Sequence, residues 1–436
     1  MFIMNVIKLQ KKYENVMNNL MTVIDAANFL NISIDTIRKW DKKGLIKVSR
    51  NTHNHRVFDI NELQRAHDKY INGSGDTHEY CILKSTEQTK YNNIELFAGA
   101  GGLALGLENA GFQHKLLVEI DKYAAATLRT NRPDWNVICD DARSVSFEGM
   151  YSDIVTGGFP CQTFSVAGQS AGFEDARGTL FFEMVRCVKE VNPKIIVGEN
   201  VKGLLTHDNG KTLQTMISIL NDIGYKVAYK VLRAQYLDVP QKRERLVIIG
   251  VRKDLDIPIL FPKERDYTIS MREALKDVPP SSGQKYPDNK YKIMSIVPAG
   301  GYWKDLPIEL QKEYMGGSFH LGGGKTGMAR RLSWDEPSLT LTCSPAQKQT
   351  ERCHPSETRP LSVREYARIQ TFPDDWIFEG STGSQYKQIG NAVPTNMAYH
   401  IGQCLISMLD NKPDYKTMEE LSNIKFSSKH VQTDLF

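Results

Sequence analysis

One cysteine of the chain lies in a context that suits nucleophilic chemistry. Cys161 stands in GGFPCQTF (157–164), directly after an apolar run that predicts a strand. Ligand sites of open α/β sheets lie at the carboxyl ends of their strands, so we expect Cys161 at such an edge. A free thiol has a pKa of about 8.5, so a nucleophilic cysteine needs cationic neighbours that stabilise its thiolate. The alternative to a nucleophilic role is that Cys161 is buried and contributes only to packing.

Charged residues at two further predicted strand ends could act with this cysteine. Glu199 closes the apolar strand KIIVGEN and, if desolvated, could donate a proton to a ring nitrogen of a base. Arg243 and Arg245 alternate in VPQKRERLVIIG, so their guanidinium groups share one face. There they could lower the pKa of Cys161 or bind phosphate. Charges on an exposed sheet edge would give the same pattern.

A glycine-rich turn predicts a ligand that contains a nucleoside. FAGAGG (97–102) lies between a predicted strand and a predicted helix, where glycines let a ligand approach the backbone closely. Glu119 ends the next strand, 20 residues after Gly99, and its carboxylate can accept both hydroxyls of a ribose. Asp141 follows the third strand, where an adenine amino group would be met. The pattern does not distinguish a dinucleotide from S-adenosylmethionine.

Alternating strand and helix patterns position these residues. From residue 92 to 255, apolar runs such as NNIELF and KLLVEI alternate with helical patterns such as FFEMVRCVKEV. This alternation predicts an α/β fold with a doubly wound, mostly parallel sheet. Between residues 256 and 358 this alternation is absent, and apolar residues at regular spacing return only near Arg359. A chain of 436 residues is long enough for about three domains.

The N-terminal part predicts a small separate domain. Residues 22–44 show two apolar helical stripes around a turn, and residues 45–57 show two short strand-like pieces. Between residues 36 and 56, seven Lys or Arg stand against one acid, Asp41, a local charge of +6 compared with +4 for the whole chain. The charge of the whole chain says little about partners, but this local excess favours contact with a nucleic acid.

This segment resembles the winged helix-turn-helix domains of mercury-resistance-type regulators. The resemblance implies that the second helix enters the major groove and that the wing meets the backbone. Thr36, Arg38 and Lys39 would then face the duplex, and Arg50 and Arg56 would contact phosphates. A solvated face of a small protein-interaction domain is the alternative.

The order of the motifs is more specific than any one of them. FAGAGG, Glu119, GGFPCQ, GENV, QKRER, REYARIQTFP and QIGNAVP resemble, in this order, the motif set of the DNA (cytosine-5) methyltransferases. The resemblance covers residues 94 to 405, apart from the interval between QKRER and REYARIQTFP, and implies an S-adenosylmethionine-dependent methyltransferase sheet. The cofactor-binding residues that it implies are Phe97, Gly99, Gly101, Gly102, Glu119, Asp141, Pro160 and Asn391.

The resemblance also implies a mechanism. Cys161 would add to carbon 6 of a cytosine while Glu199 hydrogen-bonds or protonates ring nitrogen 3. Arg245 would stabilise the developing charge, with Arg243 assisting. Carbon 5 then takes the methyl group, and loss of its proton expels Cys161. Because this chemistry cannot occur inside a stacked duplex, the base must be flipped out.

The interval without sheet alternation corresponds to the target-recognition region of that family. Together with Gln241, its cations are the predicted DNA contacts: Lys325, Arg330, Arg331, Lys348 and Arg352. Framework residues of a small second domain would give the same composition. The length of the interval argues against a tRNA cytosine methyltransferase, which is the alternative enzyme. The alternative from another class is a DNA-binding regulator that uses the methyltransferase fold as a scaffold.

The predicted organisation has six parts. They are an extension (1–21), the winged helix-turn-helix domain (22–75), a linker (76–91), the catalytic domain (92–255 and 386–411), a small irregular target-recognition domain (256–385) and a flexible tail (412–436). The tail ends in QTDLF, which is similar to peptides that dock on the bacterial replicative sliding clamp.

Other features of the composition narrow the class of protein. No run of residues is apolar enough for a membrane span, and lysines interrupt the N-terminus where a signal peptide would be apolar, so we expect a cytoplasmic protein. The seven cysteines form no CxxC pair, which suggests neither a disulfide framework nor a metal site. The family resemblance implies a monomer that modifies duplex DNA in a bacterial restriction–modification system. The N-terminal domain could also bind an operator.

Overall fold

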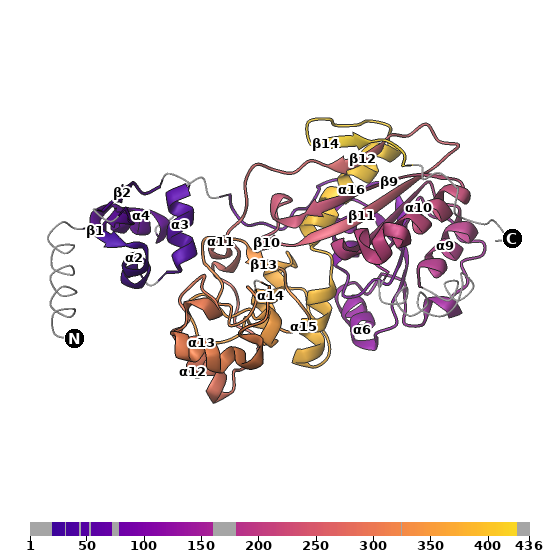
Figure 1. Cartoon of the computed structure of the whole chain (residues 1–436). Helices are drawn as coiled ribbons and strands as arrows, with labels where there is room; N and C mark the ends of the chain where they lie inside the picture. Colours follow the sequence, from indigo (N-terminus) through magenta and orange to yellow (C-terminus); the bar gives the residue numbers. More distant parts are fainter. Residues whose placement is uncertain are drawn as a thin grey trace, which may run out of the picture. The chain divides into compact units, whose positions relative to one another are not determined.

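The computed structural model describes residues 20–30, 32–42, 45–51, 54–71, 78–159, 180–323 and 325–424. Pro160, Cys161 and the predicted clamp-binding peptide 432–436 lie outside the described residues. The chain divides into two compact units, each formed from two segments (Figure 1). The first comprises Met1–Glu79 and Ile269–Glu365, and the second comprises Tyr80–Thr268 and Tyr366–Phe436. We call the second the sheet unit.

One mixed sheet organises the sheet unit. Among the described residues it has seven strands in the order β6-β5-β4-β7-β8-β11-β9. Neighbouring strands from β6 to β8 pair in parallel, whereas β11 is antiparallel to both β8 and β9. The strands are β4 Asn92–Leu96, β5 Gln113–Val118, β6 Val137–Ile138, β7 Ile154–Gly157, β8 Ile195–Val201, β9 Tyr225–Arg233 and β11 Glu244–Arg252. The predicted mostly parallel sheet is confirmed.

Helices cover both faces of this sheet. Alternate residues of β11 face opposite ways: Val247 packs in one apolar core with α5 and α16, and Ile248 packs in another with α9 and α10. The sheet is therefore doubly wound, as its apolar strands predict. The helices of this unit are α5 Gly102–Ala110, α6 Lys122–Asn131, α9 Leu180–Val191, α10 Lys211–Asp222, α15 Thr382–Asn391 and α16 Thr395–Leu409. Its short elements are β10 Gln241–Lys242, η1 Ala142–Ser144, η2 Lys202–Leu205, η3 His207–Gly210 and η4 Ala234–Tyr236.

Two predicted boundaries differ from the structure. Strand β12 (Ile259–Pro262) pairs antiparallel with β14 (Met418–Leu421), so the segment that follows residue 256 belongs to the sheet unit. Residues 366–385, which were predicted in the target-recognition domain, also belong to it. The predicted flexible tail therefore contains a strand that the described sheet unit uses. Its residues MEEL are too polar to have signalled a strand in the sequence.

The first segment of the other unit forms a compact helix-turn-helix module, residues 20–71. Its elements are β1 Leu20–Thr22, α2 Val23–Leu30, α3 Ile34–Lys42, β2 Val48–Arg50, β3 Arg56–Asp59 and α4 Ile60–Ile71. The Ser33 hydroxyl accepts the amide of Thr36 at 3.1 Å, which caps α3, and the three strands pair in the order β1-β3-β2. Ile37, Trp40 and Phe58 fill the core between them. This is the winged helix-turn-helix that the sequence predicts.

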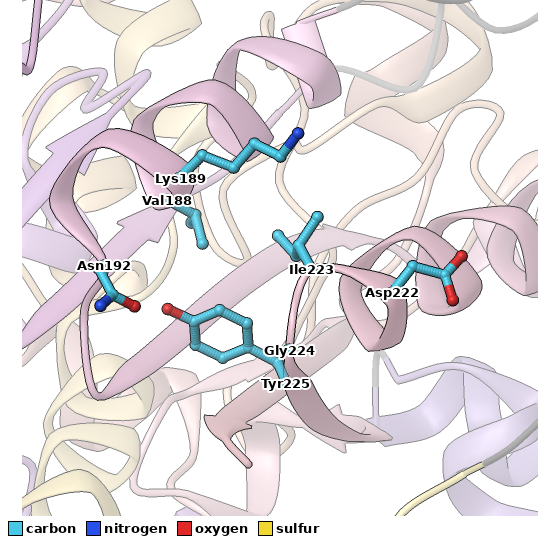
Figure 2. A pocket seen from close by; sticks show the side chains of 7 residues that line it. All are labelled: Val188, Lys189, Asn192, Asp222, Ile223, Gly224 and Tyr225. Carbon is cyan, nitrogen blue, oxygen red and sulfur yellow. The ribbon is translucent and has the colours of Figure 1, made fainter. Parts of the chain in front are cut away.

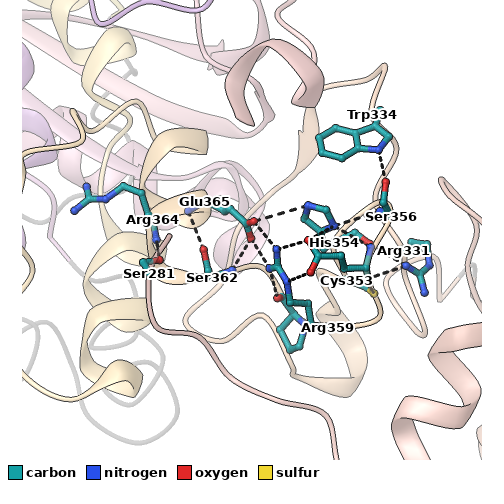
Figure 3. A network of polar contacts seen from close by, with 12 residues as sticks. Ser281, Arg331, Trp334, Cys353, His354, Ser356, Arg359, Ser362, Arg364 and Glu365 are labelled. Carbon is teal, nitrogen blue, oxygen red and sulfur yellow. Dashed lines mark hydrogen bonds and ion pairs between the residues drawn. The ribbon is translucent and has the colours of Figure 1, made fainter. Parts of the chain in front are cut away.

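The second segment, residues 269–365, has little regular structure and is called the target region below. Its elements are α11 Met271–Leu275, α12 Asp288–Ile296, α13 Ile308–Met315, η5 Trp303–Asp305, η6 Gly316–Ser318, η7 Lys348–Thr350 and β13 Ser338–Leu339, and α14 Val363–Ile369 starts at its end. Buried polar contacts support this fold (Figure 3). Arg359 donates to both carboxylate oxygens of Glu365, each at 2.8 Å, and Glu365 accepts the amide of Ser362 at 2.7 Å. No helix among the described residues is long and apolar enough to cross a membrane.

Candidate active site and nucleic-acid interface

The carboxylate of Glu119 is fixed at the end of β5 by two backbone amides. Its Oε2 accepts the amide of Gly99 and its Oε1 accepts the amide of Asp121, both at 2.7 Å. Burial raises the pKa of Glu119, and the two amides oppose this rise. Each oxygen keeps a lone pair for a further donor. A Cβ on Gly99 would meet no atom within 4 Å, so the space beside the turn is open. The role of Glu119 in binding a ribose stays a prediction.

The three glycines of the turn serve different purposes. A Cβ on Gly101 would lie 2.7 Å from Cδ2 of Leu128, and one on Gly102 would lie 2.1 Å from the carbonyl oxygen of Val393. These two glycines are therefore required by packing against the chain itself. Of the predicted cofactor-binding glycines, Gly99 is the one that borders open space. Contact of Gly101 and Gly102 with a cofactor stays a prediction.

Two further residues that were predicted to bind the cofactor, Phe97 and Asp141, are held by their local surroundings. Phe97 has a φ of +59°, which is costly for a residue with a side chain and places a strained bend at the end of β4. Asp141 accepts the backbone amide of Arg143 at 2.9 Å and its guanidinium at 2.6 Å, and this arginine lowers the pKa of Asp141 to about 2. Asp141 is thus ionised at neutral pH and can accept from an amino group.

Sequence reasoning missed one residue beside this turn. Ile120 directly follows Glu119, and 66% of it is exposed. A large apolar side chain that projects beside a fixed carboxylate is suited to cover one face of a purine. Its signal in the sequence was an apolar residue immediately after the acid that ends a strand.

A buried ion pair lies at the end of β8. Nε of Arg245 and Oε1 of Glu199 are 2.9 Å apart, and both side chains are almost fully buried. Burial raises the pKa of Glu199, while Arg245 and then Arg243 oppose this rise. The pair forms because Val247 of β11 lies opposite Glu199 of β8, which brings Arg245 to the carboxyl end of β8. Glu199 and Arg245, which come from two different strands, thus lie side by side.

This ion pair adjoins the chain that leads to Cys161. A Cβ on Gly158 would lie 3.2 Å from Oε2 of Glu199, so glycine leaves room at the carboxylate. The side-chain amide of Asn200 donates to the carbonyl of Phe159 at 2.8 Å, which ties the end of β8 to the same segment. Asn200 was not singled out from the sequence.

Arg243 has buried partners within the chain, and its predicted role as a cation beside the thiol stays a prediction because Cys161 lies outside the described residues. Arg243 is 1% exposed and donates to the carbonyl oxygens of Gly390 at 3.1 Å and Ala392 at 2.9 Å. It therefore fixes the link between α15 and α16, next to the exposed Asn391. Gln241 is fully buried and donates to Gln370 at 2.8 Å, so its predicted contact with DNA is wrong.

Two arginines of the target region that were predicted to contact DNA are buried and stabilise the backbone around them instead. Arg331 is 4% exposed and donates to the carbonyl oxygens of Met294 at 2.6 Å and Val297 at 2.7 Å. Arg352 is also buried and donates to the carbonyl oxygen of Thr340 at 3.0 Å. Both predictions are wrong, because the irregular backbone of this region leaves carbonyl groups that these guanidinium groups satisfy.

The other three predicted cations of the target region are less enclosed. Lys348 is exposed, with its ammonium 4.8 Å from the ring centre of Tyr314. Lys325 donates to the carbonyl oxygen of Leu321 at 2.7 Å. Arg330 is half-buried over the ring of Tyr302. Their contact with DNA stays a prediction.

The predicted DNA-facing residues of the helix-turn-helix module separate into three groups. Thr36 is 7% exposed and its hydroxyl lies 2.9 Å from that of Ser33, so it is covered in this structure, and its contact with DNA stays a prediction. Lys39 pairs with an acid of the target region, Glu336. The rest have exposed side chains with local partners: Arg38 with Asp35, Arg50 with Asn54 and Arg56 with Asp41.

A cavity of about 340 Å³ opens elsewhere in the sheet unit (Figure 2). It is lined by the ends of α9 and α10 and the start of β9, including Lys189, Asp222 and Tyr225. Tyr225 lies opposite Arg252 at the end of β11, and Val251 lies opposite Ile195 at the start of β8. The cavity is thus at the opposite end of the sheet from Glu199 and separate from the ion pair.

Comparisons with known proteins agree with this arrangement. Residues 91–407 match the model of the C-5 cytosine-specific DNA methylase family, and residues 22–58 match that of the MerR family regulatory protein. Similar curated proteins include Type II methyltransferase M.Eco47II of Escherichia coli, 51% identical over 416 residues that cover 91% of this chain and 97% of the relative. Type II methyltransferase M.PspPI of Psychrobacter sp. (strain TA137) is 53% identical over 412 residues, which cover 91% and 98%.

Solved structures show the same fold. A DNA modification methyltransferase encoded within an E. coli prophage aligns with a TM-score of 0.55 and 24% identity, covering 74% of this chain and all of that one. A DNMT2 variant of Spodoptera frugiperda aligns with a TM-score of 0.54 and 15% identity, covering 73% and all of it.

Proposed function

The chain belongs to the C-5 cytosine-specific DNA methylase family, and we propose that it is the modification methyltransferase of a Type II restriction–modification system. It transfers a methyl group from S-adenosylmethionine to carbon 5 of cytosine in DNA. The observation that carries the proposed site is the buried pair of Glu199 and Arg245 beside the segment that leads to Cys161. The DNA-modifying relatives give no support to the alternative of a tRNA methyltransferase.

The cofactor side of the site fits S-adenosylmethionine. When bound, this cofactor supplies an electrophilic methyl group on a sulfonium. Glu119 would accept the two ribose hydroxyls with the lone pairs that the amides leave, and Asp141 would accept from the adenine amino group. Ile120 would cover the purine, and the open space beside Gly99 would receive the ligand.

The base side of the site activates a poor nucleophile. Cys161 would add as thiolate to carbon 6 of the flipped cytosine, and Glu199 would donate a hydrogen bond or proton to nitrogen 3. The addition makes carbon 5 nucleophilic. After carbon 5 is methylated, its proton leaves to a base and the carbon–sulfur bond breaks, which restores the thiolate. Arg245 would balance the charge on Glu199 and on the base, and Arg243 would position Asn391 through the link between α15 and α16.

Transfer of a labelled methyl group tests this function. The protein is incubated with methyl-labelled S-adenosylmethionine and either duplex DNA or total tRNA. We expect label in DNA alone, on carbon 5 of cytosine, and none with Cys161→Ser. Cys404→Ser is the matched control, since Cys404 is buried in the apolar core beside α5. Label in tRNA alone would contradict the proposal. Bisulfite sequencing of DNA from cells that express the protein then gives the target sequence.

We further propose that the helix-turn-helix module binds an operator near its own gene. The match to MerR-type regulators and the exposed Arg38, Arg50 and Arg56 support this role. A gel-shift titration of the upstream DNA fragment tests it. We expect binding to weaken when these three arginines are replaced by glutamine, and the affinity of the variant to fall less steeply with salt than that of the wild type, because fewer counterions are released. Equal affinity for an unrelated fragment of the same length would contradict it.

The C-terminal peptide and the oligomeric state complete the proposal. We propose that Gln432–Phe436 docks on the replicative sliding clamp and that the protein acts as a monomer. Calorimetry with the clamp should show binding that is lost when these five residues are removed. Analytical ultracentrifugation should give the mass of one chain. Unchanged clamp binding after truncation would contradict the docking of the peptide. The mass of a dimer would contradict the monomer.

A further inference from the structure

The α3 helix of the module packs against the target region within the same compact unit. Ile32, in the turn before α3, forms a parallel β-bridge with Ala299. The following residue, Gly300, approaches α3 closely, because a Cβ built on it would lie 3.5 Å from both the Ser33 and the Thr36 hydroxyl oxygens. Gly300 has a φ of +74°, a conformation that favours glycine. The turn and the first residues of α3 thus pack closely against the backbone of Ala299 and Gly300.

Charged residues lie on both sides of this contact. Lys39 of α3 forms an ion pair with Glu336 of the target region. One turn earlier on the helix, Asp35 opposes the fall in the pKa of Arg330 that burial causes, after the larger contributions of Glu336 and Asp305, and it also raises the pKa of Asp305. Lys39 therefore meets an acid of the target region, whereas Asp35 lies near both a cation, Arg330, and an acid, Asp305. The Lys39–Glu336 ion pair and the Ile32–Ala299 bridge together favour one register of the helix against this surface.

The covered side of α3 is the side by which the resemblance predicts contact with a duplex. Thr36 is buried and Lys39 is paired, with 49% of its side chain exposed, whereas Arg38 keeps 61% of its side chain exposed. One face of a helix cannot lie in a major groove and against the target region at the same time. Charge pairs of this partly exposed kind are weak, so the contact can be released.

We propose that the target region is a docking surface for α3, and that α3 reads operator DNA only after it leaves this surface. The module then has two states, docked on residues 299–302 and Glu336 or bound to DNA through α3, and each state excludes the other. The docking part rests on the contacts alone, whereas the DNA-bound state rests on the proposed operator function.

Charge reversal in the full-length protein tests the docking part. Glu336→Lys places a cation opposite Lys39 and near Arg330, so hydrogen exchange of the amides in residues 34–42 should become roughly five- to tenfold faster. Adding Lys39→Glu should restore most of the protection. Glu313→Lys, an equal charge change on the exposed face of α13, should change nothing there. Unchanged exchange in Glu336→Lys would overturn the docking.

Gel shifts with the upstream DNA fragment test the second part. Glu336→Lys should bind that fragment more tightly than Glu313→Lys does, by about the factor seen in exchange, because both variants add the same charge. If exchange accelerates and the upstream fragment gains nothing over unrelated DNA, the docking stands and the operator function fails. If exchange is unchanged, the docking fails whatever the DNA result.

Discussion

Two buried arginines, one in each unit, have opposite relations to their surroundings. Arg245 of the sheet unit pairs with the carboxylate of Glu199, a group whose protonation can change. Arg331 of the target region donates to four backbone carbonyl oxygens, which cannot change their charge: those of Met294, Val297, His354 and Glu357. An arginine that faces an ionisable partner can take part in chemistry. An arginine whose donors are used by carbonyl groups supports a fold.

The largest effect expected from this comparison concerns the ionisable partner. Glu199→Gln keeps the size and a hydrogen-bonding group but removes the proton that the carboxyl can donate. We expect kcat for methyl transfer to fall by roughly 100-fold or more, with cofactor affinity nearly unchanged. Single-turnover kinetics and cofactor titration measure the two quantities. A variant with normal kcat would remove Glu199 from the mechanism.

The supporting arginine should affect stability instead. Arg331→Met leaves several buried carbonyl groups without a donor, so we expect the free energy of unfolding to fall by about 3 kcal/mol. Lys348→Met, the matched control, removes an exposed cation and should cost less than about 1 kcal/mol. Urea denaturation measures both. If Arg331→Met is as stable as the control and loses only DNA affinity, the assignment as a support is wrong.

The glycines of the turn repeat the contrast at a smaller scale. Gly102→Ala forces a Cβ against the carbonyl of Val393, and we expect it to lower the free energy of unfolding by about 2 kcal/mol. Gly99→Ala meets open space and has only its positive φ to oppose it, so stability should fall by about 1 kcal/mol. The affinity for S-adenosylmethionine should fall more in Gly99→Ala. Thermal denaturation with and without cofactor distinguishes the two, and the reverse order would contradict it.

Glu95 is a second buried carboxyl of the sheet unit, and in contrast to Glu199 it accepts hydrogen bonds from the uncharged side chains of Thr156 and Asn93. Burial raises the pKa of Glu95 to about 8, and the hydrogen bonds from Thr156 and Asn93 oppose this rise. The folded state therefore binds a proton that the unfolded state has lost between pH 4.5 and 8, so stability should fall as pH rises through this window. The slope should approach about 1.4 kcal/mol per pH unit. Glu95→Gln should flatten it in urea titrations at several pH values, and an unchanged slope would exclude Glu95 as the cause.

Much of the sheet unit could be predicted because strand order and strand ends are linked. Apolar strands that alternate with helices predict a parallel sheet, and the carboxyl ends of parallel strands meet at one edge. This rule placed Glu119 beside Gly99 and brought Glu199 near the segment of Cys161. It did not predict the packing reason for Gly102, which depends on the distant Val393.

Residues that do not lie at the ends of the sheet's strands were predicted poorly. Gln241, Arg331 and Arg352 are polar residue types that usually lie on the surface, and composition gave no sign of the carbonyl and amide partners that bury them. Thr36 was placed on a DNA-facing helix by resemblance, which gave no sign that its hydroxyl lies against Ser33 and Gly300. The polar residues of β14 likewise gave no signal for a strand that depends on pairing with β12.

Covalent trapping tests the central claim most directly. In a duplex that carries 5-fluorocytosine at the methylated position, carbon 5 has no proton to lose, so the bond between Cys161 and carbon 6 should persist after methyl transfer. We predict a stable protein–DNA adduct that mass spectrometry maps to Cys161 and that forms much more slowly in Glu199→Gln. An adduct at another residue, or normal methylation of cytosine with no adduct on the fluorinated duplex, would contradict the account.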